Sequence, residues 1–298
     1  MDQQLQVFVT VVERENFSRA AEELHMTQPA VSQYIQSLER QMGTRLLERT
    51  NKYVRLNKAG AIVYHHAKEI LNVYKKMHYL VDDLTAKATG LLPIGASYTF
   101  GEYMLPHIIA VMHDKYPLIR PTIMIGNTKE IVELVKNHQV EVGIVEGQLQ
   151  DESLLIEPFA TDEMVIFTSA QHDLTKTVPS RKLMSEETWI IRESGSGTRT
   201  AVDNMFRKLN ITPKNVLEFG STQLIKESVE AGVGISMLSK WAIRKELQIG
   251  TLTVLPIQGL PFLRKFSIVT KAPFQTKALE LFIQLIKEST KLFEVSKT

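Results

Sequence analysis

One short segment of the sequence combines residue types that suit the binding of a small anion. The segment Gly195-Ser196-Gly197-Thr198-Arg199 follows a predicted strand and opens a predicted helix. Its glycines let backbone amides approach a ligand closely, its hydroxyls donate hydrogen bonds, and a helix N-terminus favours negative charge. Arg199 could pair bidentately with a carboxylate, sulfate or phosphate. An ordinary capped helix after a flexible turn has the same composition, so other polar turns must converge on this one to make a site.

Three other predicted strands also end in polar turns. These turns are Ser97-Tyr98-Thr99, Glu146-Gly147-Gln148 and Gly220-Ser221-Thr222. Ligands of α/β sheets bind beyond the carboxyl ends of the strands, so we predict that the turns converge. The predicted ligand-binding residues are Ser97, Tyr98, Thr99, Glu146, Gln148, Ser196, Gly197, Thr198, Arg199, Ser221 and Thr222. Because an unpaired carboxylate would repel an anion, we expect Glu146 to pair with Arg192 or Arg199, or to bind an amine.

A second chemical signal lies near the N-terminus, where a predicted helix is capped by Thr27 and has Pro29 in its first turn. Its apolar residues recur at helical spacing and should be buried: Val31, Ile35, Leu38 and Met42. The opposite face carries Gln28, Ser32, Gln33, Gln36 and Arg40. These side chains can donate to and accept from base edges in the major groove of DNA. An ordinary three-helix bundle with a polar outer face is the alternative.

We call the helix that Thr27 caps the reading helix. Two predicted helices precede it. The first, residues 2–13, has the apolar stripe Leu5, Phe8, Val9 and Val12. The second is expected to begin at Ser18 as its cap and to bury Ala20, Ala21 and Leu24. Helix, tight turn and helix with this division of faces is the helix-turn-helix pattern, in which the second helix of the motif lies in the groove.

A basic segment follows the reading helix. Six basic residues against Glu48 alone give residues 40–58 a formal charge of +5. Within it, residues 46–56 are typical of two short strands joined by a polar turn, which is a wing. Arg49, Lys52 and Arg55 would neutralise backbone phosphates and supply an affinity that is independent of sequence and falls with salt.

These N-terminal residues resemble the LysR-type transcriptional regulators over about 60 positions. The resemblance is carried by the runs Phe17 to His25, Thr27 to Ile35, Leu38-Glu39, Gly43, Leu46 to Arg49 and Leu56 to Gly60. Two positions depart from the family pattern, Leu47 where Phe is usual and Asn57 where Thr is usual. Leu47 keeps an apolar anchor and Asn57 is as good a helix cap as Thr, so neither puts DNA binding in doubt.

The resemblance implies an α+β multidomain chain. Its parts would be a winged helix-turn-helix (residues 1–58), a long linker and dimerisation helix (59–89) and a two-lobed α/β effector domain of the periplasmic-binding-protein kind (90–298). The first lobe would hold about 90–162 and 267–298, and the second about 163–266. The linker has a possible pairing seam at Ile70, Val73, Met77, Leu80 and Leu84, which could instead pack on its own chain. His65 and His66 are adjacent, so they are read as surface residues rather than as metal ligands.

The C-terminal part alternates predicted strands and helices, including a helix over 102–115, as an α/β organisation requires. It resembles the branch of LysR-type regulators that controls sulfur assimilation and autotrophic carbon fixation. The shared runs are Gly95 to Thr99, Glu102-Tyr103, Leu105-Pro106, Gly126 to Thr128, Gly143 to Gly147 and Glu193 to Arg199. Ser194 departs from the Pro that is usual there, which leaves the shape of that turn open. This resemblance implies sulfur metabolites and sugar phosphates as the first ligands to test.

Composition excludes several classes of protein. The 298 residues contain no Cys, so disulfides, thiolate zinc sites and thiol redox sensing are ruled out. No metal, cofactor or catalytic residue is expected, because no nucleotide loop, hydrolase elbow or metal motif has the required spacing. No apolar run is long enough for a membrane span, and no signal sequence is expected, which argues against a transport binding protein. We therefore expect a cytoplasmic location and no membrane partner.

The sequence thus predicts a transcription regulator that is not an enzyme and that a small anion controls from the cleft between the C-terminal lobes. The expected partners are double-stranded DNA with a pseudo-palindromic operator, a second copy of the chain as a homodimer or homotetramer, and RNA polymerase if the protein activates. The predicted DNA-contact residues are Thr27, Gln28, Pro29, Ser32, Gln33, Gln36, Arg40, Arg49, Lys52 and Arg55. A regulator that binds DNA without any ligand is the alternative.

Overall fold

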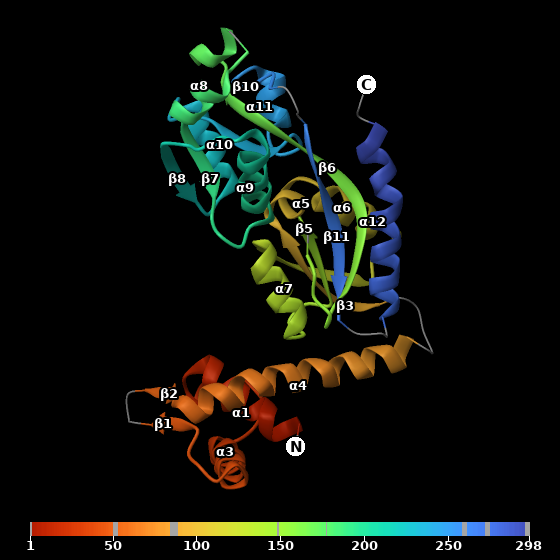
Figure 1. Ribbon diagram of the computed structural model, residues 1–298. Coiled ribbons are helices and arrows are strands. Elements are labelled where there is room, and N and C mark those ends of the chain that lie inside the picture. The colour runs from red at the N-terminus through yellow and green to blue at the C-terminus, as the bar shows by residue number, and fades with distance from the viewer. Residues whose placement is uncertain are drawn as a thin grey trace. The chain divides into compact units, whose positions relative to one another are not determined.

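A computed structural model describes residues 2–49, 53–83, 89–147, 149–176, 178–257, 261–271 and 275–295. The chain divides into two compact units, Met1–Leu84 and Thr85–Thr298 (Figure 1). Each unit is described by itself below. Among the described residues, no helix has both the length and the apolar character needed to cross a bilayer.

The N-terminal unit is built on three helices. They are α1 (Asp2–Arg14), α2 (Phe17–Glu23) and α3 (Gln28–Met42). Phe8, Ala20 and Ile35 lie in their shared core and are fully buried. Asn16 caps α2, since its side chain accepts hydrogen bonds from the backbone of Ser18 and Arg19 at 2.9 and 3.0 Å. The expectation that Ser18 is the cap is therefore wrong, because Ser18 already lies inside the helix.

The reading helix α3 follows the predicted pattern except at its end. Thr27 caps it, accepting from the backbone N–H of Ala30 at 3.4 Å. Val31, Ile35 and Leu38 are buried, but Met42 is 46% exposed. The expected burial of Met42 is therefore wrong: α3 ends at this residue, and Gly43 follows as its cap with a left-handed φ of 68°.

The predicted wing is present. Strand β1 (Leu47–Arg49) pairs antiparallel with β2 (Val54–Leu56), with Leu47 opposite Leu56. Glu39 on α3 holds the start of the wing, because its carboxylate accepts hydrogen bonds from the backbone N–H groups of Leu46 and Leu47 at 2.9 and 3.4 Å. The wing is therefore fixed to the reading helix by a side chain of that helix.

The long helix α4 (Lys58–Asp83) is capped by Asn57, whose side chain accepts a hydrogen bond from the backbone N–H of Gly60 at 2.7 Å. Its first half packs on the core of this unit through Ala67, Tyr64 and Leu71. On the predicted pairing seam, Ile70, Val73 and Met77 are 51%, 47% and 48% exposed. Leu80 is half-buried, and Leu84 lies outside the described residues.

The C-terminal unit contains a first lobe built on a mixed sheet. Strand β3 (Gly90–Ser97) lies between β4 (Ile119–Gly126) and β5 (Val142–Glu146), parallel to both. The helices around it are α5 (Tyr98–Tyr103), α6 (Leu105–Lys115), α7 (Thr128–Lys136) and α12 (Lys277–Val295). Instead of one helix over 102–115 there are two, because Pro106 has no N–H to donate to the carbonyl of Glu102. The final helix returns to this lobe and buries Phe282 beside Phe100.

A second lobe has its own core around Trp189, Met205 and Met237. Its strands are β7 (Thr188–Arg192), β8 (Asn215–Phe219), β9 (Ser236–Ser239) and β10 (Leu252–Val254). Its helices are α8 (Arg181–Glu186), α9 (Gly197–Leu209), α10 (Thr222–Glu230) and α11 (Arg244–Ile249), with a short 3-10 helix, η1 (Asp173–Lys176).

Two long strands join the lobes. Strands β6 (Leu155–Ser169) and β11 (Phe262–Thr270) pair antiparallel from Leu155 opposite Thr270 to Met164 opposite Phe262 (Figure 1). At one end β11 pairs with β5 of the first lobe, and at the other β6 pairs with β9 and β10 of the second. Side chains in the middle of these two strands therefore lie where the lobes meet.

Candidate functional site

Five polar side chains from both lobes converge at the ends of β3 and β5. We call them the Glu146 cluster: Ser97, Thr99, Glu146, Thr198 and Arg264, each 6% exposed or less. Ser97 donates to Glu146 Oε2 at 2.7 Å. Thr99 and Thr198 donate to Glu146 Oε1 at 3.2 and 3.3 Å, and Arg264 Nη1 lies 3.3 Å from the same oxygen. One carboxylate is thus held by three hydroxyls and one guanidinium.

The two threonine hydroxyls in this cluster have a fixed polarity. Arg264 donates from Nη2 to Thr99 Oγ1 and from Nη1 to Thr198 Oγ1, both at 2.9 Å. A guanidinium has only donors, so each hydroxyl must be the acceptor in that bond. Its own proton is then directed to Glu146. The arrangement therefore presents hydrogen-bond donors, which suits a negatively charged group and not a cation.

Arg264 has a second and tighter partner in Asp162. Its Nε donates to Asp162 Oδ2 at 2.7 Å, and Ser239 donates to Asp162 Oδ1 at 2.6 Å. Burial raises the pKa of the Asp162 carboxyl, and Arg264 and Ser239 oppose this shift without cancelling it. Burial lowers the pKa of Arg264, but the charges of Glu146 and Asp162 outweigh it, so the net direction is upward and the guanidinium stays cationic.

The backbones of the two lobes touch beside the cluster. A Cβ placed on Gly197 would lie 2.1 Å from the carbonyl oxygen of Glu146, a distance that no side chain tolerates. The backbone N–H of Lys129 in the first lobe donates to the carbonyl of Gly195 in the second at 3.1 Å. The predicted Gly195-to-Arg199 turn therefore does approach the end of β5, as expected from the strand ends.

A second group of polar side chains surrounds Arg192 at the end of β7. Arg192 is 1% exposed and stacks its guanidinium 4.4 Å from the centre of the Tyr98 ring. It donates to Thr222 at 3.1 Å and to both oxygens of Glu193 at 2.7 and 2.8 Å. Burial raises the pKa of the Glu193 carboxyl, but the hydrogen bonds and charge of Arg192 lower it by more, so the net direction is downward. The charge of Arg192 is therefore already compensated.

The predicted ligand residues thus separate into two groups. Ser97, Thr99, Glu146 and Thr198 meet in the Glu146 cluster, whereas Tyr98 and Thr222 meet around Arg192. Ser196 and Ser221 cap α9 and α10, where they accept from the backbone of Thr198 and Leu224. Gln148 lies outside the described residues.

Arg199 does not reach either cluster. It donates to Asp203 at 3.1 Å, to Glu218 at 2.6 Å and to the carbonyl of Arg192 at 3.1 Å. Burial lowers the pKa of Arg199, but the hydrogen bonds that it donates to Glu218 and Asp203 raise this pKa by more, so the net direction is upward. The partner of Glu146 is Arg264 and neither Arg192 nor Arg199. This corrects the expected pairing, and Arg264, Asp162 and Ser239 were missed.

One sequence signal could have identified Arg264. It lies two residues from both Phe262 and Phe266, a spacing that puts all three on the same side of a strand, where an apolar residue would be expected. A charged residue at an inward position of a strand is rarely buried without a partner. The pattern thus indicates that Arg264 has a buried carboxylate as its partner, but it does not identify which carboxylate.

The polar face of α3 is available to a partner. Gln28, Gln33, Gln36 and Arg40 are exposed, as are Thr27 and Pro29, and Ser32 is half-buried beneath Gln28, which donates to it at 3.0 Å. In the wing, Arg55 is exposed and lies 5.0 Å from the centre of the Tyr53 ring. Arg49 ends β1, with its side chain outside the described set, and Lys52 lies outside the described residues.

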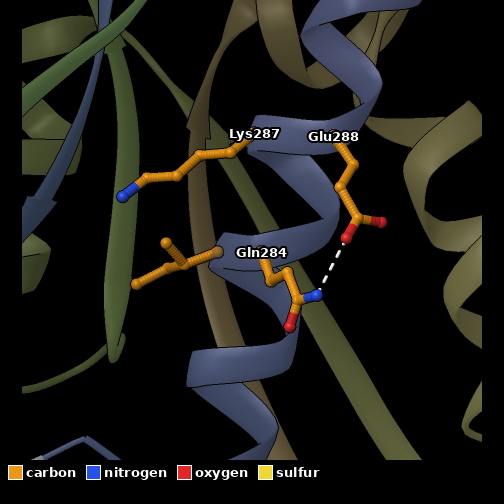
Figure 2. A pocket seen from close by; sticks show the side chains of 4 residues that line it. Gln284, Lys287 and Glu288 are labelled. Carbon is orange, nitrogen blue, oxygen red and sulfur yellow. Dashed lines mark hydrogen bonds between the residues drawn. The ribbon is translucent and has the colours of Figure 1, made fainter.

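Two other features carry no site. His65 and His66 are exposed and both lie near Glu69, at 3.9 and 2.8 Å, but solvated pairs of this kind are common without a metal. Gln284, Lys287 and Glu288 line a shallow hollow on α12 (Figure 2). Lys287 pairs with Glu157 on β6 at 2.6 Å and Gln284 donates to Glu288 at 2.8 Å, so these groups satisfy one another at the surface.

Comparisons with known proteins agree with both units. Residues 3–61 match the family described as bacterial regulatory helix-turn-helix protein, lysR family, and residues 85–291 match the LysR substrate binding domain. The HTH-type transcriptional regulator CysL of Bacillus subtilis is 36% identical over 287 residues, which is 96% of each chain. A probable RuBisCO transcriptional regulator of Trichormus variabilis is 32% identical over 95% of this chain and 86% of its own length.

Among solved structures, the regulatory domain of CcmR from Synechocystis PCC6803 in complex with 2-PG is similar to the C-terminal unit. It is 28% identical, has a TM-score of 0.62, and the match covers 68% of this chain and 98% of that domain.

Proposed function

Because this chain belongs to the LysR family of DNA-binding transcriptional regulators, with the effector-binding domain of that family, we propose that a small oxyanion bound between the lobes of the C-terminal unit controls its action at an operator. The relatives are transcriptional regulators and not enzymes. One observation carries the proposal: the hydroxyls and the guanidinium of the Glu146 cluster form a buried set of donors directed at negative charge.

The chemical class of the effector follows from this donor set and from the relatives. Burying hydrogen-bond donors without an acceptor costs free energy. A buried set made of donors therefore needs a negatively charged group to accept from it. The branch to which the chain belongs includes CysL and regulators of RuBisCO, and the CcmR domain holds 2-PG. Sulfur oxyanions and phosphorylated metabolites are therefore the first compounds to test.

A thermal-shift and binding experiment on the full chain tests this proposal. We expect sulfate, sulfite, inorganic phosphate or 2-PG to stabilise the chain, because a ligand that binds only the folded state shifts unfolding by mass action. Trp189 and Trp241 are the only tryptophans and both belong to the C-terminal unit, so their fluorescence reports on that unit. Absence of any shift, with footprints on the operator intact, would favour the regulator that acts without a ligand.

The exposed apolar stripe of α4 supports self-association. Ile70, Val73 and Met77 recur on one face with about half of their surface exposed. A second copy of α4 would cover them. Pairing with two-fold symmetry would place two α3 helices on the half-sites of a pseudo-palindromic operator.

Replacement of Gln36 tests the reading of DNA by α3. We expect Gln36→Ala to reduce discrimination between the operator and a variant changed at one base pair by about 1–3 kcal/mol, while affinity for unrelated DNA is kept. The reason is that the exposed amide of Gln36 can form hydrogen bonds with a base edge, whereas the phosphate contacts are expected from the basic residues of the wing. Gel-shift titrations against both duplexes at one salt concentration measure this.

Gln41→Ala is the matched control, since Gln41 is also an exposed glutamine of α3 but is turned about 140° away around the helix axis. Equal effects of the two substitutions would contradict the assignment of the reading face.

A further inference from the structure

The Glu146 carboxylate occupies a set of donors that an external anion would need. Oε2 accepts from Ser97, and Oε1 faces Thr99, Thr198 and Arg264. Arg264 already lies between Glu146 and Asp162, so one positive charge serves two carboxylates. An anion that entered while Glu146 stayed in place would bring a third negative charge to the same guanidinium without new donors. Entry therefore requires the departure of one carboxylate.

The two carboxylates differ in their distance from Arg264. The contacts of Asp162 are 2.6 Å to Ser239 and 2.7 Å to Arg264, which are normal for charge-assisted hydrogen bonds. Glu146 has one short contact, the 2.7 Å bond from Ser97 to its Oε2, but the three contacts to its Oε1, including that of Arg264, are 3.2, 3.3 and 3.3 Å. Asp162 is thus the closer counter-ion of Arg264, and the bond from Ser97 is the one short contact that the Glu146 carboxylate would give up on leaving.

The position of Glu146 in the chain couples its side chain to the contact between the lobes. It is the last residue of β5, and Gly147 follows with a φ of 98°, a conformation that favours glycine. Only the absence of a side chain at Gly197 lets the backbone of Glu146 come so close to the second lobe. A change in the Glu146 side chain is therefore transmitted directly to the contact between the lobes.

We propose that Glu146 is a built-in substitute for the effector: a compact oxyanion takes the donors of the Glu146 cluster only after the Glu146 side chain has left them. This inference rests on the proposed function and names the residue that regulates its site. In the absence of effector the carboxylate keeps the donors satisfied and holds the lobes together through Thr198. It also sets specificity, because a ligand must offer at least as many acceptor oxygens as the carboxylate that it displaces.

Substitution of Glu146 in the full chain tests this, with sulfate as the probe. We expect Glu146→Ala to bind sulfate at least about tenfold more tightly than wild type, since a ligand that must displace an internal competitor has its affinity reduced by the occupied fraction. Titration calorimetry measures the dissociation constants. Glu157→Ala removes a surface carboxylate from β6 and should leave sulfate affinity unchanged.

Formate provides a second readout that depends on the vacated site. Sodium formate returns a carboxylate to Glu146→Ala, so we expect it to raise the melting temperature of that variant by about 3 °C or more beyond sodium chloride at equal ionic strength. Wild type, in which the donors are already occupied, should respond equally to both salts. Should Glu146→Ala fail to fold, Glu146→Gln keeps the shape, removes the charge, and should also bind sulfate more tightly than wild type.

The outcomes separate this inference from the proposed function. If wild type binds sulfate and both Glu146 variants bind it with equal or lower affinity, the inference is wrong and the effector site lies elsewhere, while the proposed function stands. If neither wild type nor the variants bind sulfate or any other oxyanion tested, the proposed anionic effector falls together with the inference. Tighter binding in both variants supports both.

Discussion

Arg264→Ala is expected to lower the free energy of unfolding of the C-terminal unit by about 3–5 kcal/mol, the range observed when one partner of a buried ion pair is removed. Without the guanidinium, two buried carboxylates, Glu146 and Asp162, lose their counter-charge, and Thr99 and Thr198 lose a donor. Burial alone raises the pKa of Asp162, so proton uptake by that carboxyl would recover part of the loss. The remaining deficit should still be large against the total stability of such a domain.

Urea unfolding followed by tryptophan fluorescence measures this loss in the intact chain. The matched control is Lys265→Ala: Lys265 is the next residue on β11, but its side chain is exposed and donates to Thr161 at 2.7 Å. We expect its effect to stay within about 0.5 kcal/mol. Adding Asp162→Asn to Arg264→Ala should restore part of the stability because one uncompensated charge is gone. An Arg264→Ala chain as stable as the control would refute the role of Arg264 as a shared counter-ion.

The DNA-binding unit could be predicted closely because its signals are local. Thr27 caps the helix that it directly precedes, and Val31, Ile35 and Leu38 mark the buried face within two turns. Even the errors are local. Asn16 and Ser18 both suit a cap, and only the backbone conformation shows that Asn16 is the residue outside the helix. Met42 fits the apolar spacing, but helical periodicity does not reveal where the helix stops.

The ligand site could be predicted only in part because its charges are paired across long distances in sequence. Strand ends located Ser97, Thr99 and Glu146, since the ends of the parallel strands β3 and β5 share one edge of a sheet. Thr198 was located by the glycine turn that follows β7 in the second lobe. Arg264 is 102 residues from Asp162 and reaches it only because β11 runs back antiparallel along β6. Arg199 adjoins the glycine turn and is therefore the expected cation, yet it pairs with Asp203 and Glu218 instead. Proximity in sequence was therefore a poor guide to which cation meets the carboxylate.

Contact between the lobes depends on the same residues that hold the carboxylate. The backbone of Gly197 meets the backbone of Glu146, and Thr198, the next residue, donates to the Glu146 side chain. Occupancy of the donors and the approach of the lobes are thus coupled through two neighbouring residues of α9. A ligand that binds more strongly to one arrangement of the lobes shifts the balance between the arrangements by that difference in affinity.

Gly197→Ala should break this coupling and lower the stability of the C-terminal unit by about 1–3 kcal/mol or more, the usual cost of overpacking a well-packed contact. The new Cβ would lie 2.1 Å from the carbonyl oxygen of Glu146 and 2.7 Å from its Cγ, and a backbone carbonyl cannot rotate away as a flexible side chain can. Alanine is the better helix former by about 1 kcal/mol at most, so the steric term decides the sign. Relief requires the lobes to separate at this point.

Gly220→Ala is the matched control for this prediction. Both glycines lie in the segment after a strand of the second lobe, Gly197 after β7 and Gly220 after β8. A Cβ at Gly220, however, would meet nothing within 4 Å. We therefore expect a change within about 0.5 kcal/mol for Gly220→Ala, against a clear fall in the urea midpoint for Gly197→Ala. Because Trp189 and Trp241 both lie in the C-terminal unit, one fluorescence titration compares the two variants directly. Equal midpoints would show that the approach of Gly197 to Glu146 places no limit on how the lobes pack.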